Sequence, residues 1–400
     1  MPAPGPSSQV LISVSGRDRP GITAGLVGLI ASMGATLLDI EQVVTRSLLS
    51  LSMIVRLGSG LNHQDLIKEL LFKAHELGVQ LKFDVLDEKE IQKQIEKENF
   101  VITCLGDEVN AEVIARLSAL LFEEGVNIEK IGKLTREKLN CIEMTINAEK
   151  AINPREMAKK LLRLNAEFGV DISVQKETLF RKAKRLIVMD MDSTLVQMEG
   201  IDELAKEAGV GRQVAEITER AMNGELNFKE ALRERVRLLK GLPEEVLLRV
   251  YSRIPFTPGA KELIRILQKM GYKTAVLSGG FNYFTDRLKE ELHLDYAHSN
   301  QLEIIDGRLT GEVLGEIVDG LKKSDLMEEI AVKERISLDQ TIAIGDGAND
   351  LMMIGKAGLG IAFNAKPKVR EAAQHSITRK NLDSILYLLG ISDKDIEQLA

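Results

Sequence analysis

The segment Leu186-Ile187-Val188-Met189-Asp190-Met191-Asp192-Ser193-Thr194 joins an apolar run directly to two carboxylates. Four consecutive apolar residues bounded in this way are typical of a buried strand in a parallel sheet. Asp190 and Asp192 are then delivered to the C-terminal end of the strand, where ligands bind in open α/β sheets. Side chains two residues apart leave an extended chain on the same side. Because two such anions repel each other, one of them must be protonated, paired or held by a cation.

A second acidic strand end lies further along the chain. The short apolar run Thr341-Ile342-Ala343-Ile344 leads into Gly345-Asp346-Gly347-Ala348-Asn349-Asp350, a turn with two more carboxylates and an amide. We expect these four acids to meet at one edge of the sheet. Oxygen ligands of this kind suit a hard divalent cation, and with phosphate as the other partner Mg²⁺ is the expected ion.

A third strand end carries groups that suit a phosphate. The run Thr274-Ala275-Val276-Leu277 is followed by Ser278-Gly279-Gly280, whose hydroxyl and backbone amides can donate to phosphate oxygens. Lys322 and Lys323 come later, and one ammonium group beside the phosphate would offset charge on the transferring group. The two lysines are easily confused at this level.

Together these motifs resemble those of the haloacid dehalogenase-like phosphatases. That family carries DxDx[TV], a strand-end Ser or Thr, a Lys and a GDxxND loop, and all four occur in this order between Asp190 and Asp350. The resemblance implies an α/β domain with a Rossmann-like parallel sheet in residues 181–400.

Within these phosphatases, the chain is most similar to the phosphoserine phosphatase family. Residues 189–202 are similar to the opening segment of that family, and Phe228 and Arg235 match residues of its cap. The resemblance implies Mg²⁺-dependent hydrolysis of O-phospho-L-serine to L-serine and phosphate, the final step of serine biosynthesis, through an aspartyl-phosphate on Asp190. Asp192 is expected to protonate the leaving serine oxygen and then to activate water.

The same resemblance implies the binding roles. The expected metal ligands are Asp190, the backbone carbonyl of Asp192, Asp346 and, in support, Asp350. The expected phosphoryl ligands are Ser278, Gly279, Lys323 and Asn349. Glu199 is expected to bind the substrate ammonium and Arg235 its carboxylate, for which a planar guanidinium is the suited donor.

Some of these roles have alternatives. Glu199 is also compatible with a solvated position in the cap, and Arg233 and Arg237 compete with Arg235. Asp350 suits a purely structural role, bonding Lys323 and orienting its loop, as well as it suits metal contact.

The segment between the first two motif strands, residues 197–256, has apolar residues at helical spacing. We expect it to form a small helical cap that closes over a compact substrate and excludes water, which favours a metabolite over a macromolecule. After it, Thr257 and Pro258 predict the N-cap and first-turn proline of a helix.

The first 180 residues lack these motifs and contain an internal duplication. Residues 1–90 and 97–180 each predict the order strand, helix, strand, strand, helix, strand. This βαββαβ order resembles the ACT domain, a small α+β module that binds amino acids at interfaces between copies. The resemblance implies a homodimer formed through these modules and feedback regulation by L-serine. A dimerisation platform without a regulatory ligand is the alternative.

One loop of the first copy is a candidate regulatory site. It joins the first strand to the first helix and contains Asp18, Arg19, Pro20, Gly21 and Ile22, much as in amino-acid-sensing ACT domains. Exposed amides at that helix N-terminus suit a carboxylate. The second copy has Gly106-Asp107-Glu108-Val109-Asn110 at this point and lacks the Arg-Pro-Gly sequence.

Composition argues against several classes of partner. The 400 residues carry a net charge of -7, 4% aromatic residues and no tryptophan. This balance disfavours nucleic acid and anionic membrane surfaces. With no apolar stretch of membrane-spanning length and no secretory signal after Met1, a cytoplasmic protein is expected.

The cysteines and histidines suggest no further site. Cys104 and Cys141 lie in apolar runs and are expected to be buried thiols. The histidines are expected at the surface; they are His63, His75, His293, His298 and His375.

Two rival functions remain. One is a related phosphatase or phosphotransferase that acts on a different small phosphomonoester. The other is a sensor whose amino-acid-binding modules control a partner protein.

Overall fold

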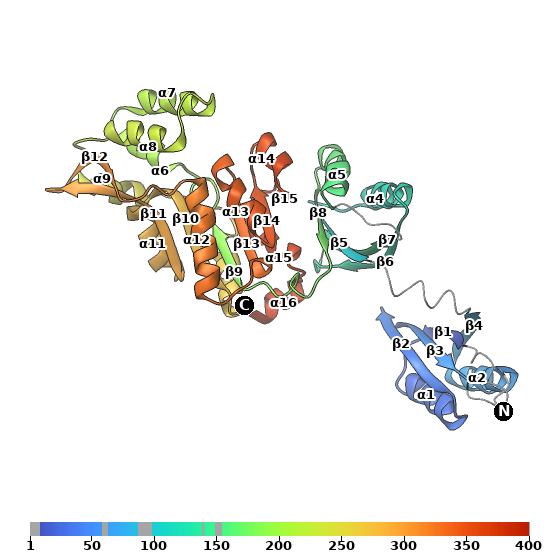
Figure 1. Cartoon of the computed structure of the whole chain (residues 1–400). Helices are drawn as coiled ribbons and strands as arrows, with labels where there is room; N and C mark the ends of the chain where they lie inside the picture. Colours follow the sequence, from blue (N-terminus) through green and yellow to red (C-terminus); the bar gives the residue numbers. More distant parts are fainter. Residues whose placement is uncertain (1–8, 58–62, 87–97, 138–139, 149–153, 400) are drawn as a thin grey trace, which may run out of the picture. The chain divides into compact units, whose positions relative to one another are not determined.

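The computed structural model describes residues 9–57, 63–86, 98–137, 140–148 and 154–399 (Figure 1). The chain divides into two compact units, Met1–Lys97 and Glu98–Ala400. The expected boundary between the two duplicated modules falls at residues 87–97, which lie outside the described residues.

The first unit is one βαββαβ module, as predicted. Its four-stranded antiparallel sheet has the order β2-β3-β1-β4, and a core that includes Ile12, Leu26 and Met53 lies between this sheet and the helices. The elements are β1 (Gln9–Arg17), α1 (Ile22–Ser32), β2 (Thr36–Thr45), β3 (Leu48–Arg56), α2 (His63–Leu77) and β4 (Val79–Leu86).

The second module repeats this fold, with sheet order β6-β7-β5-β8. In both modules the second strand has a register shift at the same place, between Leu37 and Asp39 and between Ile128 and Lys130. This shared irregularity supports the predicted duplication. The elements are β5 (Glu98–Leu105), α4 (Ala111–Glu123), β6 (Val126–Lys133), β7 (Cys141–Ala148), α5 (Pro154–Phe168) and β8 (Asp171–Lys176).

The C-terminal part contains a seven-stranded sheet of order β12-β11-β10-β9-β13-β14-β15, in which only β12 is antiparallel to its neighbour. Central strand β9 is buried on both faces: Ile187 joins one apolar cluster and Val188 the other. This explains its uninterrupted apolar run. The strands are β9 (Leu186–Met189), β10 (Lys273–Phe281), β11 (Tyr296–Ile305), β12 (Arg308–Leu314), β13 (Thr341–Gly345), β14 (Leu359–Phe363) and β15 (His375–Ile377).

Helices cover this sheet and complete the predicted α/β architecture (Figure 1). They are α10 (Ala260–Lys269), α11 (Asn282–Leu292), α12 (Gly320–Lys333), α13 (Leu351–Lys356), α14 (Pro367–Ala372), α15 (Ile385–Leu388) and α16 (Asp393–Leu399).

The insert after β9 is helical, as its apolar periodicity predicts. It consists of α6 (Gly200–Glu207), α7 (Gly211–Met222), α8 (Phe228–Arg237) and α9 (Glu244–Tyr251). The entering and leaving chains run side by side, because Gln197 N donates to Pro255 O at 2.8 Å. The β11–β12 hairpin also contacts the insert, where Gly241 N donates to Leu309 O at 2.7 Å.

Within the second unit, the second βαββαβ module packs against the seven-stranded sheet through β8 and β15. Asp171 accepts hydrogen bonds from Thr378 Oγ1 at 2.8 Å and from the Thr378 amide at 3.0 Å. Ser173 Oγ lies 2.9 Å from His375 Nδ1. Asp171, Ser173 and His375 are buried, whereas Thr378 is exposed, so the contact between module and sheet is polar and mostly enclosed.

Two sequence expectations are wrong. His375 is buried rather than exposed, because it begins strand β15 under the second module. Helix α10 begins at Ala260 after a left-handed Gly259, so Thr257 and Pro258 belong to the preceding turn. The left-handed backbone of Gly259, with φ of 76°, delays the start of the helix to the next residue. Asn381 packs so closely there that an added Cβ would lie 2.0 Å from its Oδ1.

The cysteine prediction is confirmed: Cys104 and Cys141 are free and buried, and burial raises the pKa of both thiols. Among the described residues, no helix combines the length and the apolar character needed to span a membrane.

His375 makes the stability of the second unit depend on pH. Burial, with a smaller contribution from Lys184, lowers the pKa of His375 to about 4, whereas an unfolded chain has a histidine pKa of about 6.5. Protonation therefore favours the unfolded state. Between these two values, falling pH should remove roughly 3 kcal/mol of unfolding free energy through this group, with no contribution above about pH 6.5. Chemical denaturation at several pH values measures this loss of unfolding free energy.

In this experiment His375→Gln should weaken the fall of the unfolding free energy at acidic pH. The control His75→Gln, which removes an exposed imidazole, should leave this pH dependence unchanged. Equal acid sensitivity of wild type and His375→Gln would contradict the assignment.

Candidate active site

Three neighbouring strands deliver the site to one edge of the seven-stranded sheet. β9 lies between β10 and β13, and all three are parallel. Asp190 follows β9, Ser278 lies near the end of β10 and Asp346 follows β13. Backbone pairing continues past β9, since Asp190 N donates to Ile344 O at 2.9 Å. The predicted convergence of these residues is therefore what the sheet topology produces.

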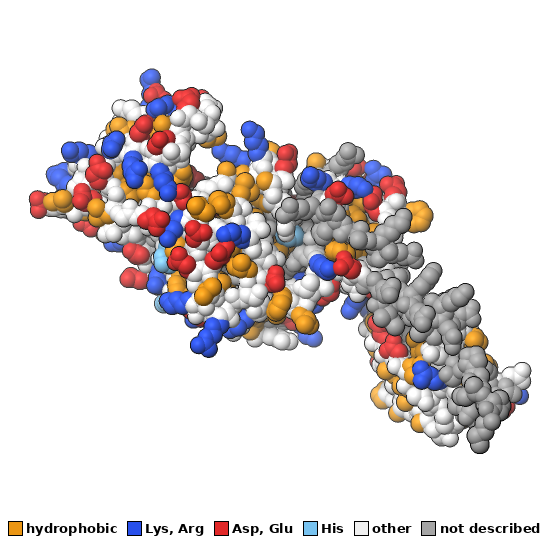
Figure 2. Space-filling model, in the orientation of Figure 1, with side chains coloured by type: hydrophobic (Ala, Val, Ile, Leu, Met, Phe, Trp, Pro, Cys, Tyr) orange, Lys and Arg blue, Asp and Glu red, His pale blue; other side chains and the backbone are white. Residues whose placement is uncertain are grey.

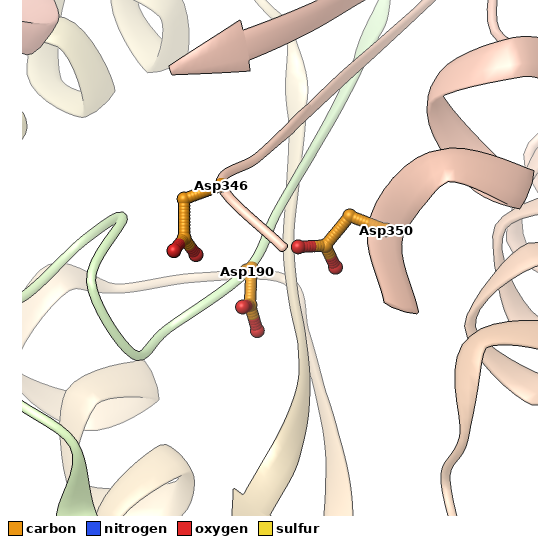
Figure 3. A group of neighbouring side chains, drawn as sticks. All are labelled: Asp190, Asp346 and Asp350. Atoms are coloured by element: carbon orange, nitrogen blue, oxygen red, sulfur yellow. The ribbon is translucent and has the colours of Figure 1, made fainter. Parts of the chain in front are cut away.

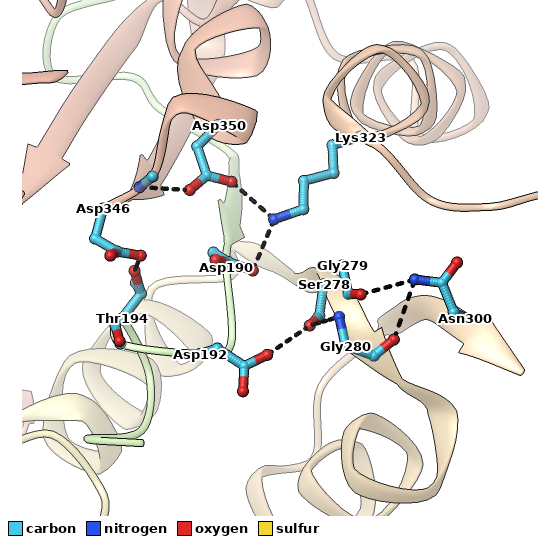
Figure 4. Close-up of polar contacts among 12 residues, drawn as sticks. Asp190, Asp192, Thr194, Ser278, Gly279, Gly280, Asn300, Lys323, Asp346 and Asp350 are labelled. Atoms are coloured by element: carbon cyan, nitrogen blue, oxygen red, sulfur yellow. Dashed lines mark hydrogen bonds and ion pairs between the residues drawn. The ribbon is translucent and has the colours of Figure 1, made fainter. Parts of the chain in front are cut away.

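Lys323 reaches this edge from the first turn of α12 (Figure 4). Its Nζ atom donates to Asp190 Oδ1 at 2.7 Å and to Asp350 Oδ1 at 2.8 Å, and all three side chains are buried. Burial alone would lower the pKa of Lys323, but the two carboxylates outweigh it and raise this pKa. Lys323 therefore stays charged beneath Asp190.

Asp190, Asp346 and Asp350 form a compact acidic cluster (Figure 3). One carboxylate oxygen from each residue lies within 4.8 Å of those of the other two. Burial, with the charge of Asp350 next, raises the pKa of Asp190 and also raises that of Asp346 to about 7. One ammonium group cannot neutralise three carboxylates, so this oxygen-only set fits a divalent cation.

Asp192 faces away from that cluster. Its Oδ1 accepts from Gly200 N, at the start of α6, at 2.7 Å, and its Oδ2 accepts from Ser278 Oγ at 3.2 Å. Burial and then the charge of Glu199 raise the pKa of Asp192 to about 7. A carboxyl group with such a pKa can both donate and accept a proton near neutral pH.

The segment Ser278–Gly280 lies near the end of β10, where the pairing with β11 is irregular. The strand continues to Phe281 instead of ending at Leu277 as predicted, but its pairing with β11 is interrupted between these two residues. Gly279 has no room for a side chain, since a Cβ there would lie 2.8 Å from Phe228 Cζ. The first residue of α8 therefore packs directly on this segment.

Two further cap residues lie at the site. Glu199 immediately precedes α6 and remains solvent-exposed on one side, yet burial of its carboxylate still raises its pKa. Arg235 is half-buried; burial lowers its pKa, and the charges of Asp202, Glu199 and Asp192 oppose this effect. The arrangement presents one anion and one cation above the acidic cluster.

The structure distinguishes between residues that the sequence left as alternatives for the same role. Lys322 points outward to pair with Glu316 at 3.0 Å, whereas Lys323 is fully buried. Arg233 and Arg237 are exposed, unlike Arg235. Asp350 bonds Lys323 and, through Oδ2, accepts from Gly347 N at 3.0 Å, so it orients its own loop as well as joining the acidic cluster.

Sequence analysis missed two polar side chains near the site. Ser193 has a left-handed backbone, with φ of 56°, and its Oγ donates to Glu199 Oε1 at 2.8 Å. Asn300 donates to Gly279 O at 2.8 Å and to Gly280 O at 3.2 Å. The serine stands inside the DMDST segment, but nothing around Asn300 marks it, because its position depends on the pairing of β11.

Asn349 lies in the loop of the acidic cluster, whereas the candidate regulatory residues lie in the first unit. Asn349 is half-buried in the turn after β13, where its backbone packs against Gly320 at the start of α12. Residues 18–22 belong to the first unit, between β1 and α1, and Gly21 has a φ of 95°.

Comparison with known proteins identifies the domains and the family of the chain. The profile of the haloacid dehalogenase-like hydrolases matches residues 184–358, and two ACT domain profiles match residues 8–84 and 99–175. The phosphoserine phosphatase of Streptomyces coelicolor is 42% identical over 388 residues, covering 97% of this chain and 93% of that one. The chain belongs to the phosphoserine phosphatase family.

Other phosphoserine phosphatases are also similar to this chain over most of its length. The phosphoserine phosphatase of Archaeoglobus fulgidus is 50% identical over 81% of this chain and 93% of its own. A solved structure of a probable phosphoserine phosphatase from Vibrio cholerae, in unliganded form, has a TM-score of 0.57 and 37% identity, covering 77% of this chain and 90% of that one.

Lys323 should be essential for both stability and turnover, and Lys322 for neither. Replacing Lys323 with Met leaves two buried carboxylates without their cation, which should lower the unfolding free energy by about 3 kcal/mol. Lys322→Met, one residue away, removes an exposed ion pair and should change it by less than about 0.5 kcal/mol. Denaturant unfolding of the two variants without divalent cation measures these changes in unfolding free energy.

Equal stability of the two lysine variants would contradict the burial and pairing of Lys323.

Proposed function

We propose that this chain hydrolyses O-phospho-L-serine to L-serine and phosphate, the last step of serine biosynthesis. One observation carries the proposal: Asp190 lies at a strand end, bonded to buried Lys323, and two residues away burial raises the pKa of Asp192 to about 7. The relatives at 42% and 50% identity are named phosphoserine phosphatases, which supports phosphoserine as the substrate.

Asp190 acts as the nucleophile. Its carboxylate attacks phosphorus, the bond from phosphorus to the serine oxygen breaks, and the phosphoryl group is transferred to Asp190. Asp192 gives its proton to the departing serine oxygen. It then takes a proton from water, which attacks the aspartyl-phosphate, releases phosphate and restores Asp190. The hydrogen bonds from Gly200 N and Ser278 Oγ orient Asp192 for both proton transfers.

Mg²⁺ is the proposed cofactor, held by Asp190, the Asp192 carbonyl and Asp346, with Asp350 in support. When bound, it would neutralise charge that repels the incoming phosphate. Asp350 has a second task, because it shares Lys323 with Asp190.

The remaining residues bind the substrate. Ser278, the Gly279 amide, Lys323 and Asn349 receive the phosphoryl group. Glu199 takes the ammonium and Arg235 the carboxylate, so the cap recognises the amino-acid part. Hydrogen bonding by Ser193 directs the Glu199 carboxylate, and this supports recognition over the solvated alternative.

The modules before residue 181 are proposed to form a homodimer and to bind L-serine as a feedback inhibitor in the cytoplasm. Support for the dimer comes from edge strand β2, which leaves Leu38, Ile40, Val43 and Val44 exposed. On the face shown in Figure 2, acidic and basic side chains are interspersed over the C-terminal part, an arrangement that supports a small-molecule substrate over nucleic acid.

The substrate test is initial-rate phosphate release from phosphoserine and from 4-nitrophenyl phosphate, in wild type and in Arg235→Ala. Loss of the guanidinium should lower kcat/KM for phosphoserine by about 100-fold, as expected for a charged hydrogen bond worth about 3 kcal/mol, and much less for the aryl ester. Arg237→Ala, which removes an exposed arginine of the same helix, is the control.

Equal losses on both esters would deny Arg235 its role. Release from other phosphomonoesters but not from phosphoserine would favour the related phosphatase, and no release at all would favour the sensor.

Magnesium should stabilise the folded enzyme through the acidic cluster. At 100 times its Kd, a bound ion adds about 2.7 kcal/mol, so MgCl₂ should raise Tm in wild type. Asp346→Asn should weaken this shift, while Asp286→Asn, at an exposed carboxylate, should retain it. A full shift in Asp346→Asn would argue against this ligand set.

Serine inhibition should depend on the first module. Asp18→Ala should raise the inhibitory serine concentration about tenfold or more, since a charged hydrogen bond is lost. Glu108→Ala changes the corresponding loop of the second module and should leave inhibition unchanged. Wild-type kinetics unaffected by saturating serine would leave the modules as a dimerisation platform.

A further inference from the structure

Asn300 is a buried amide whose hydrogen bonds connect three segments around the site. It lies on β11 and is 1% exposed. Its Nδ2 donates to Gly279 O and Gly280 O at 2.8 and 3.2 Å, and its Oδ1 accepts from Val318 N at 2.8 Å. The orientation of the amide is fixed, because a flip would place Oδ1 against two carbonyl oxygens.

The bond to Gly279 O determines where the next amide points. In a trans peptide the carbonyl of one residue and the N–H of the next face opposite directions, and the described chain has no cis peptide. With Gly279 O directed at Asn300, the Gly280 N–H is directed away from it. That N–H donates to Ser278 Oγ at 2.8 Å.

Ser278 connects the Gly280 amide to Asp192 through its hydroxyl group. Because its oxygen accepts from Gly280 N, the one hydroxyl proton donates in the substrate-free site to Asp192 Oδ2, which lies at 3.2 Å. Figure 4 shows the resulting chain of contacts from Asn300 through Gly279, Gly280 and Ser278 to Asp192. Gly280 packs closely on Asp192, since an added Cβ would lie 2.7 Å from Asp192 Oδ2.

The third bond of Asn300 connects to the segment that carries Lys323. Val318 is followed by Asp319, the N-cap of α12, whose side chain accepts from Lys322 N at 2.9 Å. Lys323 is the next residue along that first turn. One amide therefore joins the segment that orients Asp192 to the start of the helix that supplies the cation beneath Asp190.

We propose that Asn300 is a positioning residue for the proton transfer by Asp192, acting through the Gly279–Gly280 peptide and Ser278. The proposal rests on the function proposed above. It predicts a specific defect: when Asn300 is lost, Asp192 is misaligned and protonation of the leaving oxygen suffers, while Glu199 and Arg235 still bind the amino-acid part.

The choice of substrates tests this route. Phosphoserine leaves as an alkoxide that needs a proton, whereas 4-nitrophenolate departs readily without one. In Asn300→Asp, a carboxylate faces two carbonyl oxygens, and kcat/KM for phosphoserine should fall roughly 10- to 100-fold, as for other supporting residues of active sites. The loss on 4-nitrophenyl phosphate should be several-fold smaller. A merely structural defect would lower both equally.

The matched control is Asn147→Asp. Asn147 is also buried, at 5% exposure, and donates to the Glu129 carboxylate on the sheet of the second module. The substitution causes the same chemical change away from Asp192 and should keep both rates within about twofold. Circular dichroism and Tm report whether each variant is folded; if Asn300→Asp is not, Asn300→Ser removes both donors without adding charge and must show the same substrate dependence.

Folded Asn300 variants with wild-type rates, or with equal losses on both esters, would overturn the proposal. Wild-type enzyme inactive on both esters would instead overturn the proposed function itself.

Discussion

A single buried ammonium group makes the acidic site possible. Lys323 bonds Asp190 and Asp350 at 2.7 and 2.8 Å; the side chains of Lys323 and Asp350 are fully buried, and that of Asp190 is nearly so. Without this cation, the two carboxylates would repel each other at a place where burial already disfavours their charge. One ammonium group still leaves the acidic cluster short of positive charge, and a divalent cation would supply it for the phosphoryl group in transfer. The other parts of the C-terminal domain serve to bring these groups to one sheet edge.

The parallel sheet and the acidic residues at its edge could be predicted because they follow from local sequence. The apolar run 186–189 sits on both faces of a doubly covered sheet, and parallel neighbours place the residues that follow at the same edge. Lys323 was separable from Lys322 only by family resemblance, since both lie in one helical turn. Three-dimensional packing distinguishes them: Asp319 starts α12 such that Lys323 points inward and Lys322 pairs with Glu316.

What escaped prediction depends on contacts between distant segments. Asn300 acts on the segment at Gly279 through the pairing of β11 with β10, which no local pattern around it reveals. His375 looks like a surface residue in sequence, yet the second module covers it through Ser173. The predicted start of α10 was too early because Gly259, packed against Asn381, has a left-handed backbone. Each miss lies where a tertiary contact overrides a local signal.

The central claim is that Asp190 carries the phosphoryl group during turnover. Acid-quenching the enzyme during turnover of ³²P-labelled phosphoserine with Mg²⁺, followed by peptide mapping, tests it most directly. The account predicts one labelled peptide containing Asp190, with label released by hydroxylamine as from an acyl phosphate, and no label in Asp190→Asn. Phosphate release without a labelled intermediate, or label on another residue, would contradict it.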